Sequence, residues 1–274
     1  MESAAKYTKR LMQKGARANK ALGQNFLIDD KVIEQIVAIS TLYPDLPLVE
    51  IGPGLGVLTR ELAQRVNKLW AVELDRSKID ILNLELKAWQ VEVIEADALK
   101  LDLRELWGEQ KGFLVGNLPY YITSPLLMHF LAQSDVLAGM TVMVQKEVAD
   151  RLVARPGGKE YGVLSIAVQT AAAVERVMDV PAQAFLPAPK VNSAVLKFTV
   201  RTYPGLEVER EELMRVVKAA FSQRRKTLGN SLSAGLSMDK AKVVATLQRS
   251  GIVETRRAET LSIEEFQTIT NALA

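Results

Sequence analysis

A glycine-rich turn between a short strand and a helix constrains the fold of this chain more than any other feature. An apolar run, Leu48 to Ile51, leads into Gly52-Pro53-Gly54-Leu55-Gly56, and Leu58, Leu62 and Val66 share one face of the helix that follows. Glycines let the backbone pass close to a ligand, and the helix N-terminus offers free N–H groups. The spacing is G-x-G-x-G, not the G-x-G-x-x-G of dinucleotide-binding proteins, so it indicates a nucleotide-like cofactor without identifying it.

Apolar runs and helical patterns alternate along the chain after this turn. We expect further strands at residues 69–73, 91–94, 112–116, 140–144, 173–180 and 193–200, and helices at residues 76–88, 147–153 and 161–171. This alternation predicts an α/β fold with a Rossmann-like sheet.

The last quarter of the chain has a different pattern. Tyr203-Pro204-Gly205 interrupts the alternation, and residues 206–274 read as helical. One helix face there carries Leu213, Val216, Val217, Ala220 and Phe221. We therefore expect two domains, an α/β domain at residues 1–204 and a small all-helical domain at residues 205–274.

Three successive strand ends offer groups that suit an adenosine. After the glycine turn, Glu73 ends the second strand 21 residues beyond Gly52, where a carboxylate can hold ribose hydroxyls. Asp97 follows the third strand and can accept a hydrogen bond from an adenine amino group. Leu74 and Ala98 are suitably apolar for the faces of that ring.

The fourth strand end carries Asn117-Leu118-Pro119-Tyr120. The Asn117 side-chain oxygen and a backbone carbonyl freed by the turn can each accept a hydrogen bond from one exocyclic amino group, and Tyr120 can stack on the ring that carries it. From these four residues alone, an ordinary turn with a core tyrosine is an equally good interpretation.

Composition narrows the chemistry. The chain has no cysteine and one histidine, His129, which excludes thiolate metal sites and argues against histidine-based metal or triad chemistry. No apolar run is long enough to span a bilayer, and the first residues lack the apolar segment of a signal peptide, so we expect a cytoplasmic protein.

Positive charge gathers at the two ends of the chain. Residues 1–20 carry six Lys and Arg against one Glu, and residues 205–274 carry eleven against nine acidic residues. Basic ends favour a polyanionic partner. We interpret residues 1–20 by themselves as a solvated basic extension, with residues 6–20 loosely ordered. We interpret Arg224-Arg225-Lys226 as phosphate contacts, because one cation would satisfy a helix C-terminus.

Several segments occur in one order and at consistent spacing. They are Gly23-Gln24-Asn25-Phe26-Leu27, the turn from Glu50 to Gly56, Glu73, Asp97, Asn117-Leu118-Pro119-Tyr120 and Phe185-Leu186-Pro187-Ala188-Pro189-Lys190-Val191-Asn192-Ser193. Together they closely resemble the bacterial ribosomal RNA adenine dimethyltransferases over nearly the whole chain. The main departure is Asn25, where many members of that family carry histidine.

The resemblance implies an S-adenosylmethionine-dependent methyltransferase sheet. It also implies methyl transfer to N6 of two adjacent adenosines near the 3′ end of 16S rRNA, within the small ribosomal subunit, and a role in small-subunit biogenesis. Carried over to this chain, the family roles place Asn25 and Leu27 over the cofactor and the turn with Gly52 and Gly54 under its methionine part. Glu73 then holds the ribose, Asp97 the adenine amine, and Asn117 borders cofactor and target. We expect a monomer without a metal ion.

Such a reaction needs few acids and bases, because the methyl group leaves a sulfonium that departs neutral. Hydrogen bonds from N6 to Asn117 Oδ1 and to the Leu118 carbonyl would aim the nitrogen lone pair, so catalysis rests on positioning and electrostatics. The target base must leave its stack and would rest on Tyr120. For the second aromatic face the resemblance favours Phe185, for which the residues alone support a core position equally well.

Three other functions compete with this interpretation. The nearest is the related group that methylates adenine N6 in 23S rRNA and confers macrolide resistance. A non-catalytic assembly or transcription factor of the same fold could lose Glu73, Asp97 or Asn117 without penalty, and all three are present. A dinucleotide oxidoreductase is disfavoured by the glycine spacing.

Overall fold

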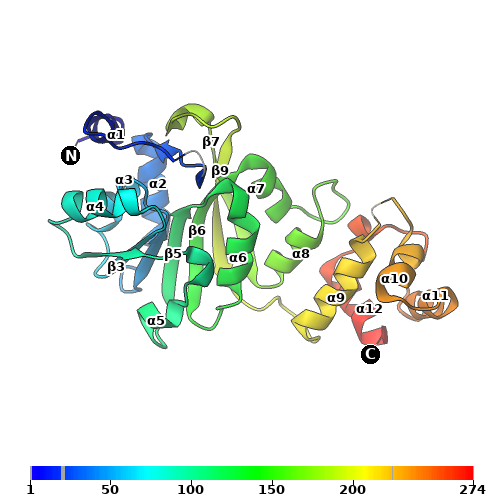
Figure 1. Cartoon of the computed structure of the whole chain (residues 1–274). Coiled ribbons are helices and arrows are strands. Elements are labelled where there is room, and N and C mark those ends of the chain that lie inside the picture. The colour runs from blue at the N-terminus through cyan, green and yellow to red at the C-terminus, as the bar shows by residue number, and fades with distance from the viewer. Residues whose placement is uncertain (1, 20–21, 224, 274) are drawn as a thin grey trace. The chain divides into compact units, whose positions relative to one another are not determined.

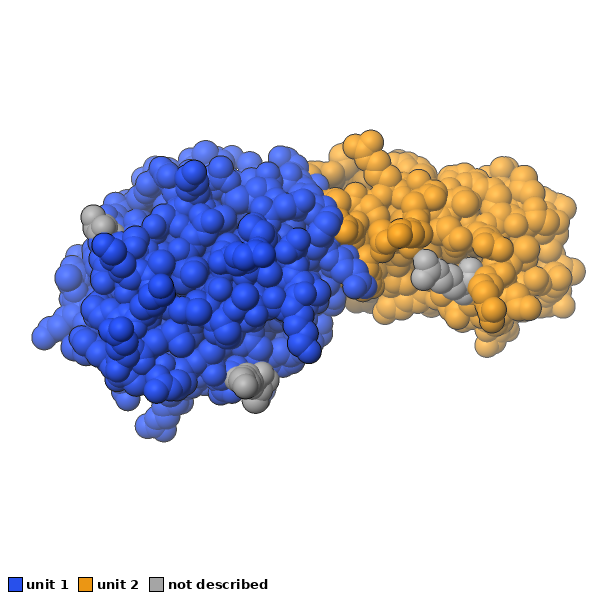
Figure 2. Space-filling view, turned by 90° about the horizontal axis from the view of Figure 1, so that it is seen from above, with its two compact units in different colours: residues 1–149, 174–200 blue, residues 150–173, 201–274 orange. Residues whose placement is uncertain are grey.

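The structure is a computed structural model that describes residues 2–19, 22–223 and 225–273. It divides into two compact units, coloured separately in Figure 2: Met1–Ala149 with Val174–Val200, and Asp150–Ala173 with Arg201–Ala274. Residues 150–173, which we expected in the first domain, group with the helical end of the chain. Tyr161 and Ile166 explain this grouping, since both are buried in the hydrophobic core of the second unit.

A seven-stranded sheet forms the centre of the first unit (Figure 1). The strands, in spatial order, are β4 (Val91–Glu95), β3 (Leu69–Glu73), β2 (Leu48–Ile51), β5 (Gly112–Asn117), β6 (Leu137–Gln145), β9 (Ser193–Val200) and β7 (Ala172–Val180). β4, β3, β2, β5 and β6 pair in parallel, and β9 pairs antiparallel with β6. Every strand predicted from the sequence is present, which confirms the α/β, Rossmann-like fold.

Helices alternate with the strands of the first unit, and α9 to α12 follow one another in the second unit. In chain order they are α1 (Ala4–Gln13), α2 (Asp30–Ser40), α3 (Val57–Leu62), α4 (Arg76–Glu85), α5 (Leu103–Trp107), α6 (Thr123–Leu131), α7 (Lys146–Leu152), α8 (Val163–Gln169), α9 (Arg210–Phe221), α10 (Leu228–Leu236), α11 (Lys240–Arg249) and α12 (Ile263–Leu273). α2 contacts β5 and β6, α4 contacts β3 and β4, and α6 contacts β6. Completely buried Leu114, Val115 and Val142 show that the middle of the sheet is core.

Residues 4–13 of the basic N-terminal extension form helix α1, so the prediction of a loosely ordered segment was wrong for residues 6–13. Ser3 caps α1, and Ala4, Tyr7, Thr8 and Leu11 are buried. These four residues lie at positions i, i+3, i+4 and i+7, which is one face of a helix. The excess of Lys and Arg on the other positions concealed this short stripe.

The second unit has its own hydrophobic core, formed by α8 to α12. The stripe predicted on α9 is confirmed, because Leu213, Val216, Val217 and Ala220 are buried and Phe221 packs against them. Within the described residues, none of the helices combines the length and apolar character required to cross a membrane.

Candidate functional site

The order of the sheet reverses beside β2. The chain runs outward from β2 to β3 and β4, then returns to place β5 and β6 on the other side of β2. In open α/β sheets, ligands bind outside the carboxyl ends of the strands at such a reversal.

A cavity opens at this point. It is lined by ten of the residues predicted from the sequence: Asn25, Leu27, Gly52, Gly54, Glu73, Asp97, Asn117, Leu118, Pro119 and Tyr120. The structure thus brings residues from every strand end that we singled out to one cavity. The segment before α2 lines the same cavity.

The glycine turn presents its backbone to this cavity. Gly52, Gly54 and Gly56 all have φ in the left-handed region, at 69°, 58° and 79°. The Gly56 N–H donates to the Pro53 carbonyl at 2.9 Å, which closes the turn. A Cβ on Gly54 would lie 3.2 Å from the ring of Phe26, so the turn also packs closely on the segment before α2.

Glu73 holds the turn in place and keeps one oxygen partly available. Its side chain is only 5% exposed. Oε1 accepts hydrogen bonds from the N–H groups of Leu74 and Asp75 at 2.9 and 2.8 Å, and Oε2 accepts from Gly54 at 3.0 Å. Burial raises the pKa of Glu73, while these bonds oppose the rise. Because a carboxylate oxygen accepts about two hydrogen bonds, Oε2 has room for one more donor from the cavity.

Glu50 is a cavity residue whose role the sequence reasoning missed. It lies in β2, lines the cavity and is 2% exposed. Its Oε2 has no hydrogen-bond partner among the described residues. Burial, aided by the nearby charge of Glu73, raises the pKa of Glu50 to about 8. An unpaired buried carboxylate is costly unless a ligand compensates it. The signal was available, because Glu50 is the only charged residue in the run Leu48 to Ile51.

Asp97 lies where β4 ends, beside two apolar cavity residues. Its Oδ1 accepts from the Leu99 N–H at 3.0 Å, and the carboxylate retains further acceptor sites. Leu74 and Ala98 line the same cavity, and Leu74 is 49% exposed. A carboxylate together with apolar side chains suits a flat ring that carries an amino group.

Asn117 ends β5 with a fixed side-chain orientation. Its Nδ2 donates to the backbone carbonyl of Asn25 at 3.1 Å. Because a carbonyl can only accept, the amide nitrogen must point toward Asn25, and Oδ1 is left to face another donor. The next residue is held too, since the Leu118 N–H donates to the Met143 carbonyl at 3.1 Å.

Two adjacent tyrosines border the cavity. Tyr120 is half-buried, and its hydroxyl pairs with that of Ser193 at 2.6 Å. Burial raises the pKa of Tyr120, so the ring stays neutral. Tyr121 also lines the cavity but is 57% exposed. The sequence reasoning did not single out Tyr121, although an aromatic residue directly after Tyr120 was visible.

The segment before α2 reaches the cavity through a short strand pairing. β1 (Phe26–Leu27) pairs antiparallel with β8 (Phe185–Leu186), with Leu27 opposite Phe185. This pairing places Asn25 and Leu27 at the cavity. It also buries Phe185, which is 2% exposed, belongs to the core and does not line the cavity. Phe185 thus occupies a core position in this structure, and its stacking role stays a prediction.

The predicted phosphate contacts lie in the second unit. Arg225 and Lys226 are exposed in the turn between α9 and α10. Arg224 lies outside the described residues.

Known proteins match this chain over almost its whole length. The sequence model of the family described as ribosomal RNA adenine dimethylase matches residues 15–274. A protein of Desulfitobacterium hafniense named ribosomal RNA small subunit methyltransferase A is 63% identical over 273 residues, covering 100% of this chain and 98% of that protein. A protein of the same name from Alkaliphilus metalliredigens is 46% identical over 265 residues, covering 94% and 92%.

Two solved structures resemble the fold. A dimethyladenosine transferase from Plasmodium falciparum superposes with a TM-score of 0.76 at 22% identity, covering 89% of this chain and 95% of that one. The 23S rRNA methyltransferase ErmE superposes with a TM-score of 0.71 at 30% identity, covering 91% and 99%. With the family match over residues 15–274, these findings establish that the chain belongs to the ribosomal RNA adenine dimethylase family.

Proposed function

We propose that this chain transfers methyl groups from S-adenosylmethionine to N6 of two adjacent adenosines near the 3′ end of 16S rRNA, within the small ribosomal subunit. The observation that carries the proposal is the fixed amide of Asn117. Its Nδ2 donates to the Asn25 carbonyl at 3.1 Å, so Oδ1 is an oriented acceptor at the carboxyl end of β5.

The cavity fits S-adenosylmethionine group by group. The backbone of the glycine turn and the unpaired Oε2 of Glu50 suit the polar, positively charged methionine end. The remaining acceptor site of Glu73 Oε2 suits one ribose hydroxyl. From the sequence we had expected Glu73 to accept hydrogen bonds from both ribose hydroxyls. Asp97 suits the adenine amine.

When bound, S-adenosylmethionine supplies an electrophilic methyl group on a sulfonium. The protein contributes geometry, because Asn117 Oδ1 and the Leu118 carbonyl accept hydrogen bonds from the target amine. These bonds favour a pyramidal nitrogen and direct its lone pair, and the proton released after attack passes to water. Positioning and preorganised dipoles carry the rate enhancement, which suits a site built without histidine.

The target base must leave its stack, at a cost of a few kcal/mol. Tyr120 offers one aromatic face, held by its hydroxyl contact with Ser193. Phe185 does not line the cavity in this structure, whereas the exposed ring of Tyr121 does. We assign Tyr121 to a nucleotide at or beside the target, because stacking on an exposed ring offsets the cost of unstacking.

The alternative substrate is an adenosine of 23S rRNA, as in the name of the ErmE relative. Identity favours the small subunit, since proteins named for it are 63% and 46% identical to this chain and ErmE is 30% identical. Exposed Arg225 and Lys226 are proposed to contact phosphates of either RNA and do not separate the two.

Purified small and large ribosomal subunits, both lacking adenine methylation, test the substrate side by side. Incubation with the chain and S-adenosylmethionine carrying a labelled methyl group should place label in small subunits. Label in large subunits alone would overturn the assignment and favour the alternative.

A further inference from the structure

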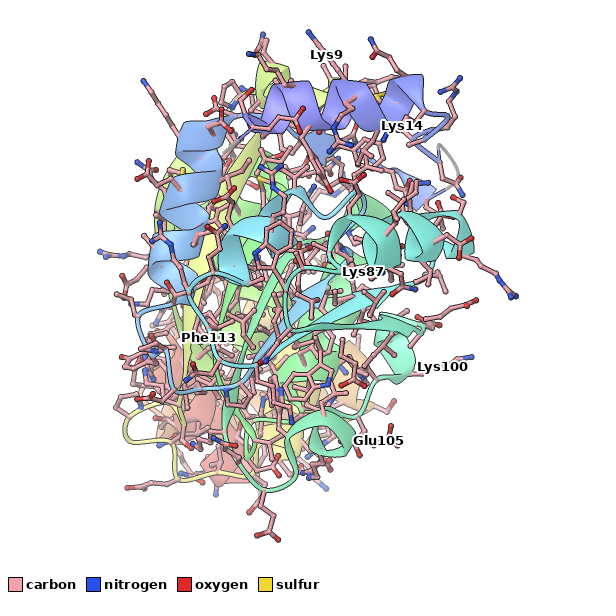
Figure 3. The ribbon with its side chains drawn as sticks, turned by 90° about the vertical axis from the view of Figure 1, so that its left-hand side faces the viewer. Lys9, Lys14, Lys87, Lys100, Glu105 and Phe113 are labelled. Carbon is pink, nitrogen blue, oxygen red and sulfur yellow. The ribbon has the colours of Figure 1, made fainter. Side chains whose placement is uncertain are left out.

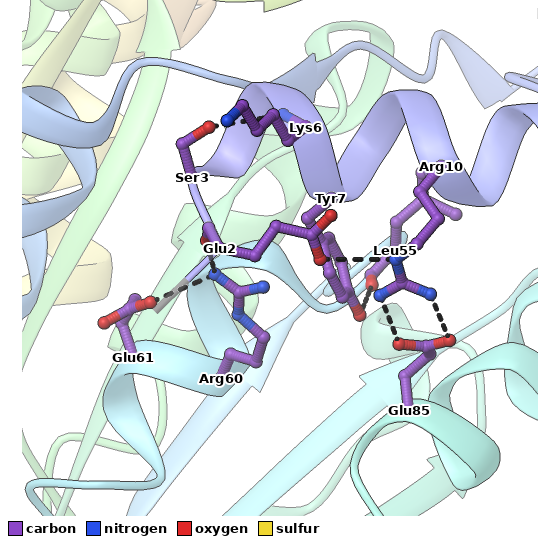
Figure 4. Close-up of polar contacts among 9 residues, drawn as sticks. All are labelled: Glu2, Ser3, Lys6, Tyr7, Arg10, Leu55, Arg60, Glu61 and Glu85. Atoms are coloured by element: carbon purple, nitrogen blue, oxygen red, sulfur yellow. Dashed lines mark hydrogen bonds and ion pairs between the residues drawn. The ribbon is translucent and has the colours of Figure 1, made fainter.

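The N-terminal helix α1 lies outside the part of the chain that the family model covers, which begins at residue 15. It is nevertheless fastened to the cofactor side of the first unit by several polar contacts (Figure 4). Its outward face is different, because Lys9 is exposed and points away from the rest of the unit (Figure 3). The contacts of α1 with residues that line the cavity therefore come from its buried face.

Tyr7 makes the contact nearest to the cavity. It is 1% exposed, and its hydroxyl donates to the backbone carbonyl of Leu55 at 2.9 Å. Leu55 stands in the middle of the glycine turn, between Gly54 and Gly56, and lines the cavity. Burial raises the pKa of Tyr7, so its hydroxyl stays a hydrogen-bond donor at any ordinary pH.

The turn depends on such contacts because its glycines restrict the backbone little. One side is held where the Gly54 N–H donates to Glu73 Oε2 at 3.0 Å. The other side is held where Tyr7 donates to the Leu55 carbonyl, one residue further on. The first hydrogen bond holds the N–H group of Gly54, and the second holds the carbonyl of Leu55. Together they fix the orientation of the peptide groups on either side of the Gly54–Leu55 pair.

Charged side chains fix Tyr7 in turn. The Arg60 guanidinium lies 4.3 Å from the centre of the Tyr7 ring and donates to the Glu2 carbonyl at 2.9 Å. Arg10 forms a two-bond ion pair with Glu85, at 3.0 and 2.8 Å. Arg60 belongs to α3, which follows the glycine turn, and Glu85 ends α4, which follows the strand of Glu73.

We propose that Tyr7 is a positioning residue for the methyl-donor site, and that α1 is a strap that holds the glycine turn in its binding conformation. The proposal rests on the proposed function, because it takes the turn as the seat of S-adenosylmethionine. Without the Tyr7 hydroxyl, the Leu55 carbonyl loses its partner and the free turn samples more conformations. Binding of the donor must then order the turn, which lowers affinity without changing the geometry once the donor is bound.

The test is Tyr7→Phe, which keeps the ring beside Arg60 and removes only the hydroxyl. Tyr203→Phe is the matched control, since it removes a tyrosine hydroxyl that donates to Glu264 at 2.5 Å in the second unit. Binding of S-adenosylhomocysteine is measured by calorimetry, well below the melting temperature of each variant. Loss of one neutral hydrogen bond predicts about two- to tenfold weaker binding for Tyr7→Phe and no change for Tyr203→Phe.

Kinetics separate positioning from a merely structural role. In Tyr7→Phe the KM for S-adenosylmethionine should rise by the same factor, while kcat at saturating donor and the KM for RNA stay within about twofold. A lower melting temperature with unchanged binding and unchanged KM would overturn the proposal.

A second variant protects the test against misfolding. Glu85→Gln removes the ion pair with Arg10 and leaves Tyr7 intact, so binding should weaken in the same direction and by less. If Tyr7→Phe does not fold, unchanged binding in Glu85→Gln refutes the strap. Should the unaltered chain fail to bind S-adenosylhomocysteine, the proposed function is refuted. If it binds and the variants bind equally well, the strap alone is refuted.

Discussion

Asn117 gives the sharpest single prediction about catalysis. In Asn117→Ala the amide is lost, and with it both the bond to Asn25 and the oriented acceptor Oδ1. The Asn25 bond is an ordinary neutral hydrogen bond, worth about 1 kcal/mol, so donor binding should weaken about fivefold. The acceptor acts on the reacting amine, where one preorganised group contributes about 3 kcal/mol, so kcat should fall about a hundredfold or more.

The assay is single-turnover methyl transfer to small ribosomal subunits at saturating S-adenosylmethionine, with S-adenosylhomocysteine binding measured separately. Asn83→Ala is the matched control, because Asn83 is exposed on α4 and does not line the cavity. A kcat for Asn117→Ala within tenfold of the unaltered chain would refute the positioning role. Equal losses in kcat and in donor affinity would also refute it, since they would reduce Asn117 to a binding residue.

Other predictions follow from single side chains. Glu73→Ala should weaken S-adenosylhomocysteine binding at least about tenfold by calorimetry, because the glycine turn loses its anchor. The pKa of Glu50 rises from 4.5 to about 8 on folding, so its contribution to the free energy of unfolding is complete below about pH 4.5 and is lost as the pH rises through about 8; urea unfolding should show a smaller fall over that range in Glu50→Gln. Replacing Arg225 and Lys226 by Ala should reduce the slope of log RNA affinity against log salt concentration by about one unit per cation removed. An unchanged slope would show that the two residues do not contact phosphates. Tyr121→Ala should raise the KM for RNA by about five- to a hundredfold with donor binding unchanged, and Tyr121→Phe should restore it.

Tyr43→Ala is the control for the Tyr121 variant. The two tyrosines are 61% and 57% exposed, and among them only Tyr121 lines the cavity. Equal effects of the two substitutions on the KM for RNA would show that Tyr121 acts through general surface properties.

Residues at strand ends were predictable because the parallel sheet brings distant segments together. Once Leu48 to Ile51 and its neighbours were identified as strands, the topology required Glu73, Asp97 and Asn117 to meet at one edge. Sequence spacing alone supplied this inference.

Residues whose position depends on packing were harder to place. The helix α1 was missed because its apolar face consists of four buried positions only, whereas residues 1–20 contain six basic residues. The burial of Phe185 was hard to foresee because it accompanies a two-residue pairing with β1, and such a pairing has no clear sequence pattern. Glu50 required knowledge of its burial, since the strand pattern does not reveal that one carboxylate oxygen lacks a partner.

Nucleoside analysis of methylated small subunits tests the central claim most directly. Unmethylated small subunits are incubated with the chain and labelled S-adenosylmethionine, and their RNA is digested to nucleosides. The account predicts label in N6,N6-dimethyladenosine, at two residues of each 16S rRNA, and almost none with Asn117→Ala. Label confined to another nucleoside, or transfer that survives in Asn117→Ala, would contradict it.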